Sequence, residues 1–204
     1  MTKLILVRHC QSEGNLEKFF QGTIDTDITD VGFDQINRTA VLLKNEHIDV
    51  IYSSPKKRAL KSAKGINVYH NVDIKTDERL CEIDAGLWEG ILLENIQKTF
   101  PQAYDKGKND PANFAAPGGE TMTHVYERVS AAVKDIVSQN KEKTICIVSH
   151  GCAIRNMMCY AHGWSIDRIG ELTIGKNMTV NIISFDDALR PHILMEGYSS
   201  HLDN

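Results

Sequence analysis

The sequence has no long hydrophobic run, no paired cysteine motif and no excess of positive charge. Its apolar runs, such as residues 4–7 and 145–148, are far shorter than the roughly 20 residues that cross a bilayer. The cysteines are odd in number and scattered, without a Cys-x-x-Cys pair, so neither a zinc site nor a disulfide framework is expected. A net charge of -4 gives no electrostatic support for a nucleic-acid partner. The five cysteines are Cys10, Cys81, Cys146, Cys152 and Cys159.

The remaining composition is that of an ordinary globular protein. Hydrophobic residues make up 42% and charged residues 25% of 204 residues, which suits one domain with a full core and is too short for two. We therefore expect a single domain over residues 1–204. The apolar run after Met1 is too brief for a signal peptide, so we expect a cytoplasmic protein without a membrane partner. No feature of the sequence indicates an oligomeric state.

Strand-like and helix-like segments alternate along the chain. This alternation predicts an α/β protein with three layers: a mostly parallel central sheet, helices on both faces and an antiparallel edge strand. The segment 82–122 is rich in glycine and proline and is expected to be an irregular lid over the substrate, with a short helix near 92–100. The predicted strands are 3–7, 48–52, 72–76, 144–148 and, both at a sheet edge, 180–185 and 192–195. The predicted helices are 30–45, one that starts with Ser54 as cap and Pro55 in its first turn, 121–139 and 152–162.

Two of the predicted strands stop at a histidine. Arg8 and His9 follow the first strand, and His150 follows the fourth. In an open α/β sheet, ligands bind beyond the carboxyl ends of the strands, so these side chains are expected to share one anion-binding site. Neutral imidazole attacks phosphorus without prior deprotonation, and the guanidinium fork of Arg8 matches phosphate oxygens. His9 is therefore the candidate nucleophile of a phosphoryl transfer.

Arg58 and Glu82 supply the other groups that phosphoryl transfer requires. Arg58 lies about one turn into the helix that starts near Ser54, so its side chain can reach back over the strand end. Glu82 follows the third strand and is the candidate proton donor, a role that partial burial favours. Each residue alone has an ordinary explanation. Arg58, for example, stands among lysines, so it could belong to a solvated helix face. The interpretation depends on their common position after a strand.

Five ordered motifs, from residue 3 to about residue 155, resemble those of the histidine phosphatase superfamily, the phosphoglycerate-mutase-like proteins. The first, Arg8-His9-Cys10-Gln11-Ser12 with Asn15, is similar to the family signature R-H-G-[EQ]-[ST]-x-x-N. The segment Trp88-Glu89-Gly90 has the form typical of the phosphatase branch. The other matching positions are Gln21-Gly22, Asp25, Thr29, Gly32, Ser53-Ser54-Pro55, Arg58-Ala59, Leu80, Glu82, Gly86, Pro117-Gly118-Gly119-Glu120 and Ser149-His150-Gly151.

The resemblance implies a phosphomonoester hydrolase that uses no metal or organic cofactor and acts on a small phosphorylated metabolite. His9 would become a phosphohistidine. Glu82 would give a proton to the leaving group and later take one from the attacking water. The implied phosphoryl-binding residues are Arg8, Arg58 and His150, assisted by Asn15, and the other implied substrate-binding residues are Ser12, Gln21, Gly22 and Gly151.

Two cysteines depart from the family pattern. Cys10 replaces the usual glycine, and Cys152 stands where a small residue is frequent. If the glycine were needed for its backbone angles, a cysteine there would be strained, and its side chain could also narrow the pocket. We favour the simpler interpretation that each cysteine is a harmless small apolar substitution.

Other functions use parts of the same sequence. Asp25-Thr26-Asp27-Ile28-Thr29 fits the D-x-D-x-T motif of haloacid-dehalogenase-type phosphatases, but the segment before it contains glycine and is a poor strand. A phosphoglycerate mutase would use the same His9, although mutases of this family are usually longer. A non-catalytic phosphate-binding domain is expected to lack a site residue, and none is missing. The candidate substrates are sugar phosphates, phosphoglycerates, nucleotides and α-ribazole phosphate.

Overall fold

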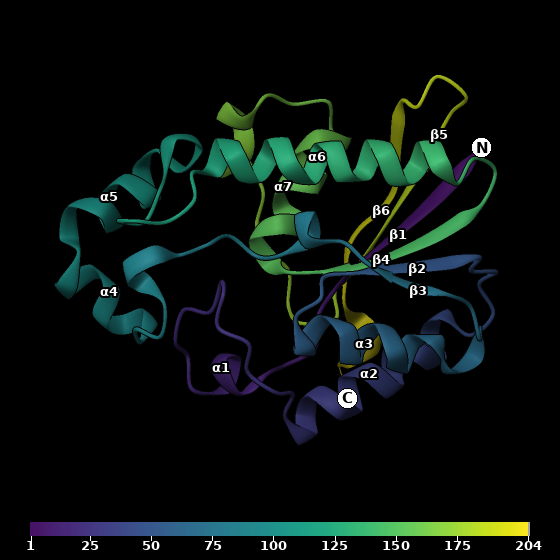
Figure 1. The fold of residues 1–204 in the computed structure, drawn as a ribbon, viewed down its shortest axis with the longest axis horizontal. Helices are drawn as coiled ribbons and strands as arrows, with labels where there is room; N and C mark the ends of the chain where they lie inside the picture. The colour runs from purple at the N-terminus through teal and green to yellow at the C-terminus, as the bar shows by residue number, and fades with distance from the viewer. Residues whose placement is uncertain (204) are drawn as a thin grey trace.

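A six-stranded sheet forms the middle layer of the protein, whose computed structural model describes residues 1–203. The strand order is β3-β2-β4-β1-β5-β6 (Figure 1). The first four strands are mutually parallel where they pair, whereas β5 runs antiparallel to β1 and β6 antiparallel to β5. The strands are β1 (Thr2–Arg8), β2 (Val50–Ser53), β3 (Ile74–Thr76), β4 (Thr144–Ser149), β5 (Val180–Phe185) and β6 (Pro191–Tyr198).

The predicted fold class is confirmed, with one correction at the end of the chain. We expected both late strands at a sheet edge, but only β6 lies there, because β5 pairs with β1 on one side and β6 on the other. The burial of the two strands agrees with these positions. Five of the six β5 residues are buried, whereas most residues of β6 are exposed.

Helices cover both faces of the sheet. Figure 1 shows α2 and α3 on one face and α6 and α7 on the other. No helix within residues 1–203 is both long and apolar enough to span a bilayer. The α-helices are α1 (Glu13–Leu16), α2 (Asp30–Leu43), α3 (Lys57–Ile66), α4 (Leu93–Thr99), α5 (Pro101–Asn109), α6 (Met122–Gln139) and α7 (Gly151–Ala161). Short 3₁₀ helices are η1 (Asn67–Tyr69), η2 (Glu78–Leu80), η3 (Gly86–Trp88), η4 (Pro111–Asn113), η5 (Ile166–Glu171) and η6 (Ser200–Leu202).

Successive residues of β1 pack on opposite faces of the sheet. Leu4 and Leu6 belong to the core that includes α6 and α7, and Ile5 and Val7 to the core that includes α2 and α3. Side chains alternate along a strand, so a central strand covered on both faces requires an unbroken apolar run. This explains why the first apolar run of the sequence is continuous rather than alternating.

Capping side chains start two of the long helices, whereas the cap predicted at Ser54 is wrong. The side chains of Thr29 and Thr121 each accept a backbone N–H in the first turn of α2 and α6. Ser54 does not cap the next helix, which begins at Lys57. Its hydroxyl group instead lies 2.8 Å from Nε2 of His150. A buried polar partner from another strand end has replaced the local capping bond.

The segment 82–122 is more regular than the sequence predicts. It contains α4, close to the expected short helix, and also α5, which was not predicted. Pro101 occupies the first turn of α5, where its missing N–H has no intrahelical partner to lose. Figure 1 shows α4 and α5 standing apart from the layered body, on the side opposite the N-terminus.

The carboxyl ends of three central strands meet at one edge of the sheet. β1 and β4 stay in register as far as Arg8 and Ser149, and β2 and β4 as far as Ser53 and Val148. Ligands of open α/β sheets bind beyond this edge. The residues that directly follow these strand ends are His9, Ser54 and His150.

Candidate active site

His9 is buried at the end of β1, with the orientation of its ring defined by one hydrogen bond. Nδ1 lies 2.7 Å from the carbonyl oxygen of Cys10. Because a carbonyl oxygen can only accept, Nδ1 carries the proton of the neutral ring. The lone pair therefore lies on Nε2, which is the nitrogen left for a ligand.

Burial keeps both site histidines uncharged. It lowers the pKa of His9 well below its usual value, and the positive charges of Arg8 and Arg58 act in the same direction. The pKa of His150 is lowered in the same way, by burial first and then by its cationic neighbours. A neutral imidazole has a free nitrogen lone pair, so the site holds His9 in the form that attacks an electrophile.

His150 precedes α7 as its N-cap residue, and its ring centroid lies 5.0 Å from that of His9. Its Nε2 is hydrogen-bonded to Oγ of Ser54 at 2.8 Å. Its Nδ1 is buried without a partner in the described part of the chain. Since buried polar atoms are nearly always paired, this nitrogen is suited to a ligand atom. Oγ of Ser54 also lies 3.4 Å from Sγ of Cys81, a residue that lines the groove beside Glu82.

The side chain of Arg8 lies against Gly151, the first residue of α7. Its Nη1 donates to the carbonyl oxygen of Gly175 at 2.5 Å, and its Nε is buried with no partner among residues 1–203. A Cβ atom on Gly151 would lie 3.4 Å from Cζ of Arg8 and 2.7 Å from Cγ2 of Ile174. Gly151 therefore leaves room for Ile174, and the Arg8 side chain lies within ordinary contact distance of it.

Arg58 is fully buried, so the alternative of a solvated helix face is wrong for this residue. Its guanidinium group donates to the carbonyl oxygens of Gln21, Gly22 and Ile24 at 3.3, 3.2 and 2.8 Å. Its Nε has no partner within the described residues. Burial lowers the pKa of Arg58, and nearby carboxylates, Glu82 first, oppose that effect. Arg58 thus stabilises the loop of residues 21–24, and its Nε–H group remains available for a ligand.

Ser12, Asn15 and Gln21 form one hydrogen-bond network near His9. Oγ of Ser12 accepts from Nε2 of Gln21 at 2.7 Å and donates to Oδ1 of Asn15 at 3.1 Å. Asn177, which sequence reasoning did not identify, donates to Oδ1 of Asn15 at 3.2 Å and to the carbonyl oxygen of His9 at 3.0 Å. Ser12 and Gln21 are thus occupied by protein partners, and they position Asn15 at the start of α1.

The carboxylate of Glu82 lies against the first turn of α7. Its Oε1 accepts the N–H groups of Ile83 and Ala153 at 3.0 and 3.1 Å, and its Oε2 accepts that of Cys152 at 3.0 Å. The first N–H groups of a helix have no intrahelical partner and favour a negative charge. Glu82 is therefore held at the same end of α7 that carries His150.

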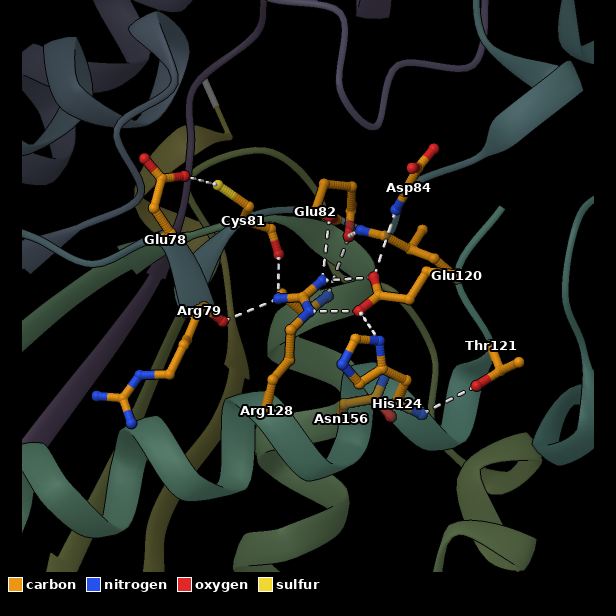
Figure 2. A network of polar contacts seen from close by, with 12 residues as sticks. Glu78, Arg79, Cys81, Glu82, Asp84, Glu120, Thr121, His124, Arg128 and Asn156 are labelled. Atoms are coloured by element: carbon orange, nitrogen blue, oxygen red, sulfur yellow. Dashed lines mark hydrogen bonds and ion pairs between the residues drawn. The ribbon is translucent and has the colours of Figure 1, made fainter. Parts of the chain in front are cut away.

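A partly buried ion pair beneath Glu82 holds the backbone that carries it (Figure 2). Nε and Nη2 of Arg128 bind the two carboxylate oxygens of Glu120 at 2.6 and 2.9 Å. The other N–H groups of Arg128 donate to the carbonyl oxygens of Arg79, Cys81 and Glu82 at 2.8, 2.8 and 3.1 Å. Arg128 was not predicted. Because its whole donor fork is engaged by protein, Arg128 acts on the position of Glu82.

Glu89 secures the loop that Arg58 holds from the other side. Its carboxylate accepts four backbone N–H groups, three of them from consecutive residues of this loop. Gly22 has no room for a side chain, because a Cβ atom would lie 1.9 Å from the carbonyl oxygen of Ile83. The site thus fixes the loop through its carbonyl groups and its N–H groups together. The four donors to Glu89 are Gly22, Thr23, Ile24 and Ala85, at 3.0, 2.8, 3.2 and 3.2 Å.

The structure supports the simple interpretation of Cys10. Its side chain is fully buried in the core that includes α2 and α3, and its backbone is not in the left-handed region. Its N–H donates to Oγ of Ser62 at 3.0 Å. Burial raises the pKa of the Cys10 thiol to about 11, so the thiol stays protonated. Cys10 behaves as a small apolar residue of the core.

The aspartates of the D-x-D-x-T stretch do not follow a strand. They belong to the loop before α2, where Oδ1 of Asp25 accepts the N–H of Lys57 at 2.8 Å and Asp27 pairs with Lys61 at 2.5 Å. A haloacid-dehalogenase-type nucleophile has to stand at the end of a buried strand. That alternative is therefore wrong for this chain.

The assembled site has the chemical groups for moving a phosphoryl group. It offers a neutral imidazole nitrogen of His9, unpaired N–H groups of Arg8 and Arg58, and the carboxyl group of Glu82. Guanidinium groups stabilise the negative charge of a phosphoryl group, and a carboxyl group can transfer a proton to the leaving oxygen. A groove of about 520 Å³ opens beside Glu82, and its lining includes Lys56.

Comparison with known sequences identifies relatives of this chain. The model of the histidine phosphatase superfamily (branch 1) matches residues 4–193. The chain is 35% identical over 202 residues to phosphoserine phosphatase 1 of Hydrogenobacter thermophilus, and the match covers 99% of this chain and 95% of that protein. Its similarity is thus spread over the whole length rather than confined to the motifs.

Comparison with solved structures gives the same family. The chain resembles Bacillus stearothermophilus YhfR with a TM-score of 0.93 and 30% identity over 100% of both chains. It also resembles the phosphoserine phosphatase of Entamoeba histolytica in complex with 3-phosphoglyceric acid, with a TM-score of 0.85 and 29% identity, over 99% of this chain and 100% of that one. A variant of the Entamoeba enzyme was solved in complex with phosphoserine. Structural neighbours of this chain therefore bind small phosphorylated molecules.

Proposed function

Because this chain belongs to the histidine phosphatase superfamily, branch 1, we propose that His9 carries the phosphoryl group during hydrolysis and that phosphoserine is a substrate. The chain is a phosphoric monoester hydrolase for small phosphorylated metabolites. One observation carries the mechanism: the hydrogen bond from Nδ1 of His9 to Cys10, which leaves the lone pair on Nε2. The choice of phosphoserine rests on relatives that bear this substrate in their names.

In the first step, Nε2 of His9 attacks phosphorus while the bond from phosphorus to the leaving oxygen breaks. Glu82 gives its proton to that oxygen, so the product leaves as an alcohol. We assign this proton to Oε2 of Glu82, because Oε1 already accepts two backbone N–H groups and Oε2 accepts one. The residues proposed to bind the phosphoryl oxygens are Arg8, Arg58, His150 and Asn15.

In the second step, a water molecule attacks the phosphohistidine, and Glu82 takes a proton from that water. The bond between phosphorus and Nε2 breaks, inorganic phosphate leaves, and His9 regains its lone pair. Burial favours the neutral ring and therefore favours release of the phosphoryl group. The two steps balance in atoms and charge without a metal ion or an organic cofactor.

The other predicted site residues have supporting roles in this proposal. Ser12 and Gln21 orient Asn15 at the start of α1, while Gly22 leaves space for neighbouring backbone and Gly151 for Ile174. We propose that the segment 82–122 acts as a lid, since part of α5 lines a cavity beside the site. Substrate selection is then a property of that cavity.

A phosphoglycerate mutase would form the same phosphohistidine, so the fate of the phosphoryl group separates the two activities. The test is incubation of the protein with 3-phosphoglycerate and a trace of bisphosphoglycerate, followed by measurement of inorganic phosphate and 2-phosphoglycerate. We expect phosphate release to exceed isomer formation. Formation of 2-phosphoglycerate in excess of phosphate would replace hydrolysis by the mutase reaction as the main activity.

Phosphohistidine formation is tested directly by rapid quenching of the protein with ³²P-labelled phosphoserine. A phosphohistidine loses its label in acid and keeps it in alkali, whereas an acyl phosphate on a carboxylate is cleaved in alkali. We expect an alkali-stable label at His9, and kcat should fall by at least roughly three orders of magnitude in His9→Ala. Near-normal turnover of this variant, or a label on an aspartate, would remove His9 from the mechanism.

The control is His47→Asn, which removes an imidazole whose side chain is 88% exposed. It should keep normal turnover and labelling. The same protein preparations should also be assayed with p-nitrophenyl phosphate. Absence of turnover on phosphoserine together with turnover on p-nitrophenyl phosphate would reject the substrate and keep the mechanism.

A further inference from the structure

One arginine outside the proposed catalytic set has no partner for its charge. Of the eight arginines, all but Arg8, Arg58 and Arg155 form an ion pair with a carboxylate within residues 1–203. The same three have a buried Nε without a hydrogen-bond partner. Arg8 and Arg58 belong to the proposed phosphoryl-binding site, where the missing partner is a ligand. Arg155 lies outside that site, and the ligand group that could pair with it has to be identified.

Arg155 lies on α7, one helical turn after Gly151, against which the Arg8 side chain packs. One turn of an α-helix rises about 5.4 Å. Arg8, Gly151 and Arg155 also line one cavity of about 300 Å³. A ligand with its phosphoryl group at Arg8 can therefore extend through this shared cavity toward Arg155.

Arg155 also borders a second cavity, of about 590 Å³, that lies beside α5. Ile174 lines both cavities, so Arg155 and Ile174 stand where the two spaces meet. Binding pockets typically combine apolar walls with a few placed polar groups, and a charge among apolar walls pairs strongly with an opposite charge. The other walls of the larger cavity include Phe20, Ile83, Trp88, Tyr104, Phe114 and Met122.

No carboxylate within residues 1–203 forms an ion pair with Arg155, and Glu196, which lines the smaller cavity with it, is paired with His162. Burial lowers the pKa of Arg155, and the groups that oppose this effect are the thiols of Cys152 and Cys159. Both thiols have raised pKa values because of burial, so they carry no charge near neutral pH. A half-buried cation without a counter-charge is costly, and an anionic ligand would remove that cost.

We propose that Arg155 binds a carboxylate on the leaving group of the substrate and thereby selects phosphorylated carboxylic acids. The inference rests on the proposed function, because the phosphoryl group has to lie at Arg8 and His9. A guanidinium fork can bind both oxygens of a carboxylate at once. Phosphoserine and 3-phosphoglycerate belong to this class. Phosphoethanolamine is phosphoserine without its carboxylate, and glycerol 3-phosphate is 3-phosphoglycerate with a hydroxymethyl group in place of the carboxylate.

The test measures kcat and KM for phosphoserine and for phosphoethanolamine in the wild-type protein, Arg155→Met and Arg155→Lys. Met keeps an unbranched apolar side chain and removes the charge, while Lys keeps the charge and loses the fork. The wild-type protein should prefer phosphoserine by roughly 10- to 100-fold in kcat/KM. Arg155→Met should remove this preference, mainly by raising KM for phosphoserine, and should leave kcat/KM for phosphoethanolamine within about threefold.

Arg155→Lys should keep part of the preference, and it serves as the informative variant if Arg155→Met does not fold. Arg190→Met is the surface control, because its side chain is 77% exposed on the turn between β5 and β6. This control should leave both substrates unaffected. An equal loss on the two substrates in the Arg155 variants, or an unchanged preference, would overturn the assignment of Arg155.

Failure of this inference differs from failure of the proposed function. If the wild-type protein hydrolyses both substrates without a preference, the carboxylate site is rejected and phosphoserine hydrolysis stands. If the wild-type protein hydrolyses p-nitrophenyl phosphate but neither phosphoserine nor phosphoethanolamine, phosphoserine is rejected as substrate. The pair 3-phosphoglycerate and glycerol 3-phosphate, with the same ratio test, then decides the role of Arg155.

Discussion

The imidazole rings of His9 and His150 lie with their centroids 5.0 Å apart and their planes inclined by 55°. Both are buried side chains whose pKa values are well below the usual value for histidine. Burial is the main cause for each ring, and the guanidinium groups of Arg8 and Arg58 add to it. The folded protein therefore keeps two rings neutral that the unfolded chain would protonate at an ordinary pKa of about 6.5.

This difference predicts how stability depends on pH. Below about pH 6.5 the unfolded chain binds protons that the native site does not, so the free energy of unfolding falls as the pH falls. We expect Tm to decrease between about pH 7.5 and pH 5.5, and the double variant of His9→Gln and His150→Gln should show a smaller decrease. Thermal unfolding measured across this range checks the prediction. Equal slopes for the variant and the wild-type protein would contradict it.

The contacts of Glu82 predict a burst in its glutamine variant. p-Nitrophenolate is a weak base that leaves without a proton, so Glu82→Gln should still be phosphorylated by p-nitrophenyl phosphate. The second step lacks its base, and steady turnover should fall by roughly 10²- to 10⁴-fold. Stopped-flow absorbance should then show one equivalent of p-nitrophenol before a slow phase. Glu94→Gln, an exposed change on α4, is the control, and a variant with no burst would contradict the role of Glu82.

Arg128 acts through the backbone of Glu82, so a change of Arg128 should cause a smaller loss of turnover than the change of Glu82 (Figure 2). In Arg128→Met, three backbone carbonyl groups lose a charged donor, and kcat for phosphoserine should fall by at least roughly tenfold with little change in KM. The rate of the p-nitrophenol burst should fall less, because this leaving group needs no proton from Glu82. Arg128→Lys should restore only part of the loss, because an ammonium group cannot replace the fork. A burst rate that falls as much as kcat for phosphoserine would indicate a general structural role instead.

Much of the site could be predicted because its residues directly follow apolar runs. The position of His9 and His150 depends on where β1 and β4 end, and each strand end is visible in the sequence as a short buried run. Parallel pairing then brings the two ends together. The same rule selected Arg58 and Glu82, which follow β2 and β3, and the motifs agreed with that choice.

The supporting contacts could not be predicted, because they join a side chain to the backbone of a distant segment. Asn177 and His9 are 168 residues apart, and Arg128 and Glu82 are 46 apart. No local pattern distinguishes such an asparagine or arginine from a surface residue. Ser54 shows the converse: its local pattern predicts a helix cap, but burial next to His150 gives its hydroxyl group a tertiary partner.

Glu89 provides the last prediction, since one carboxylate accepts four backbone N–H groups around the loop that Arg58 holds. In Glu89→Gln, the amide NH₂ group replaces one acceptor oxygen and faces N–H groups that then lose their partner. Each buried N–H left unpaired costs about 1–3 kcal/mol, so the variant should unfold at lower denaturant concentration. KM for phosphoserine should also rise, because a loosened loop no longer fixes Arg58. Glu127→Gln, an exposed change on α6, should alter neither quantity, and wild-type values for Glu89→Gln would show that the loop needs no carboxylate.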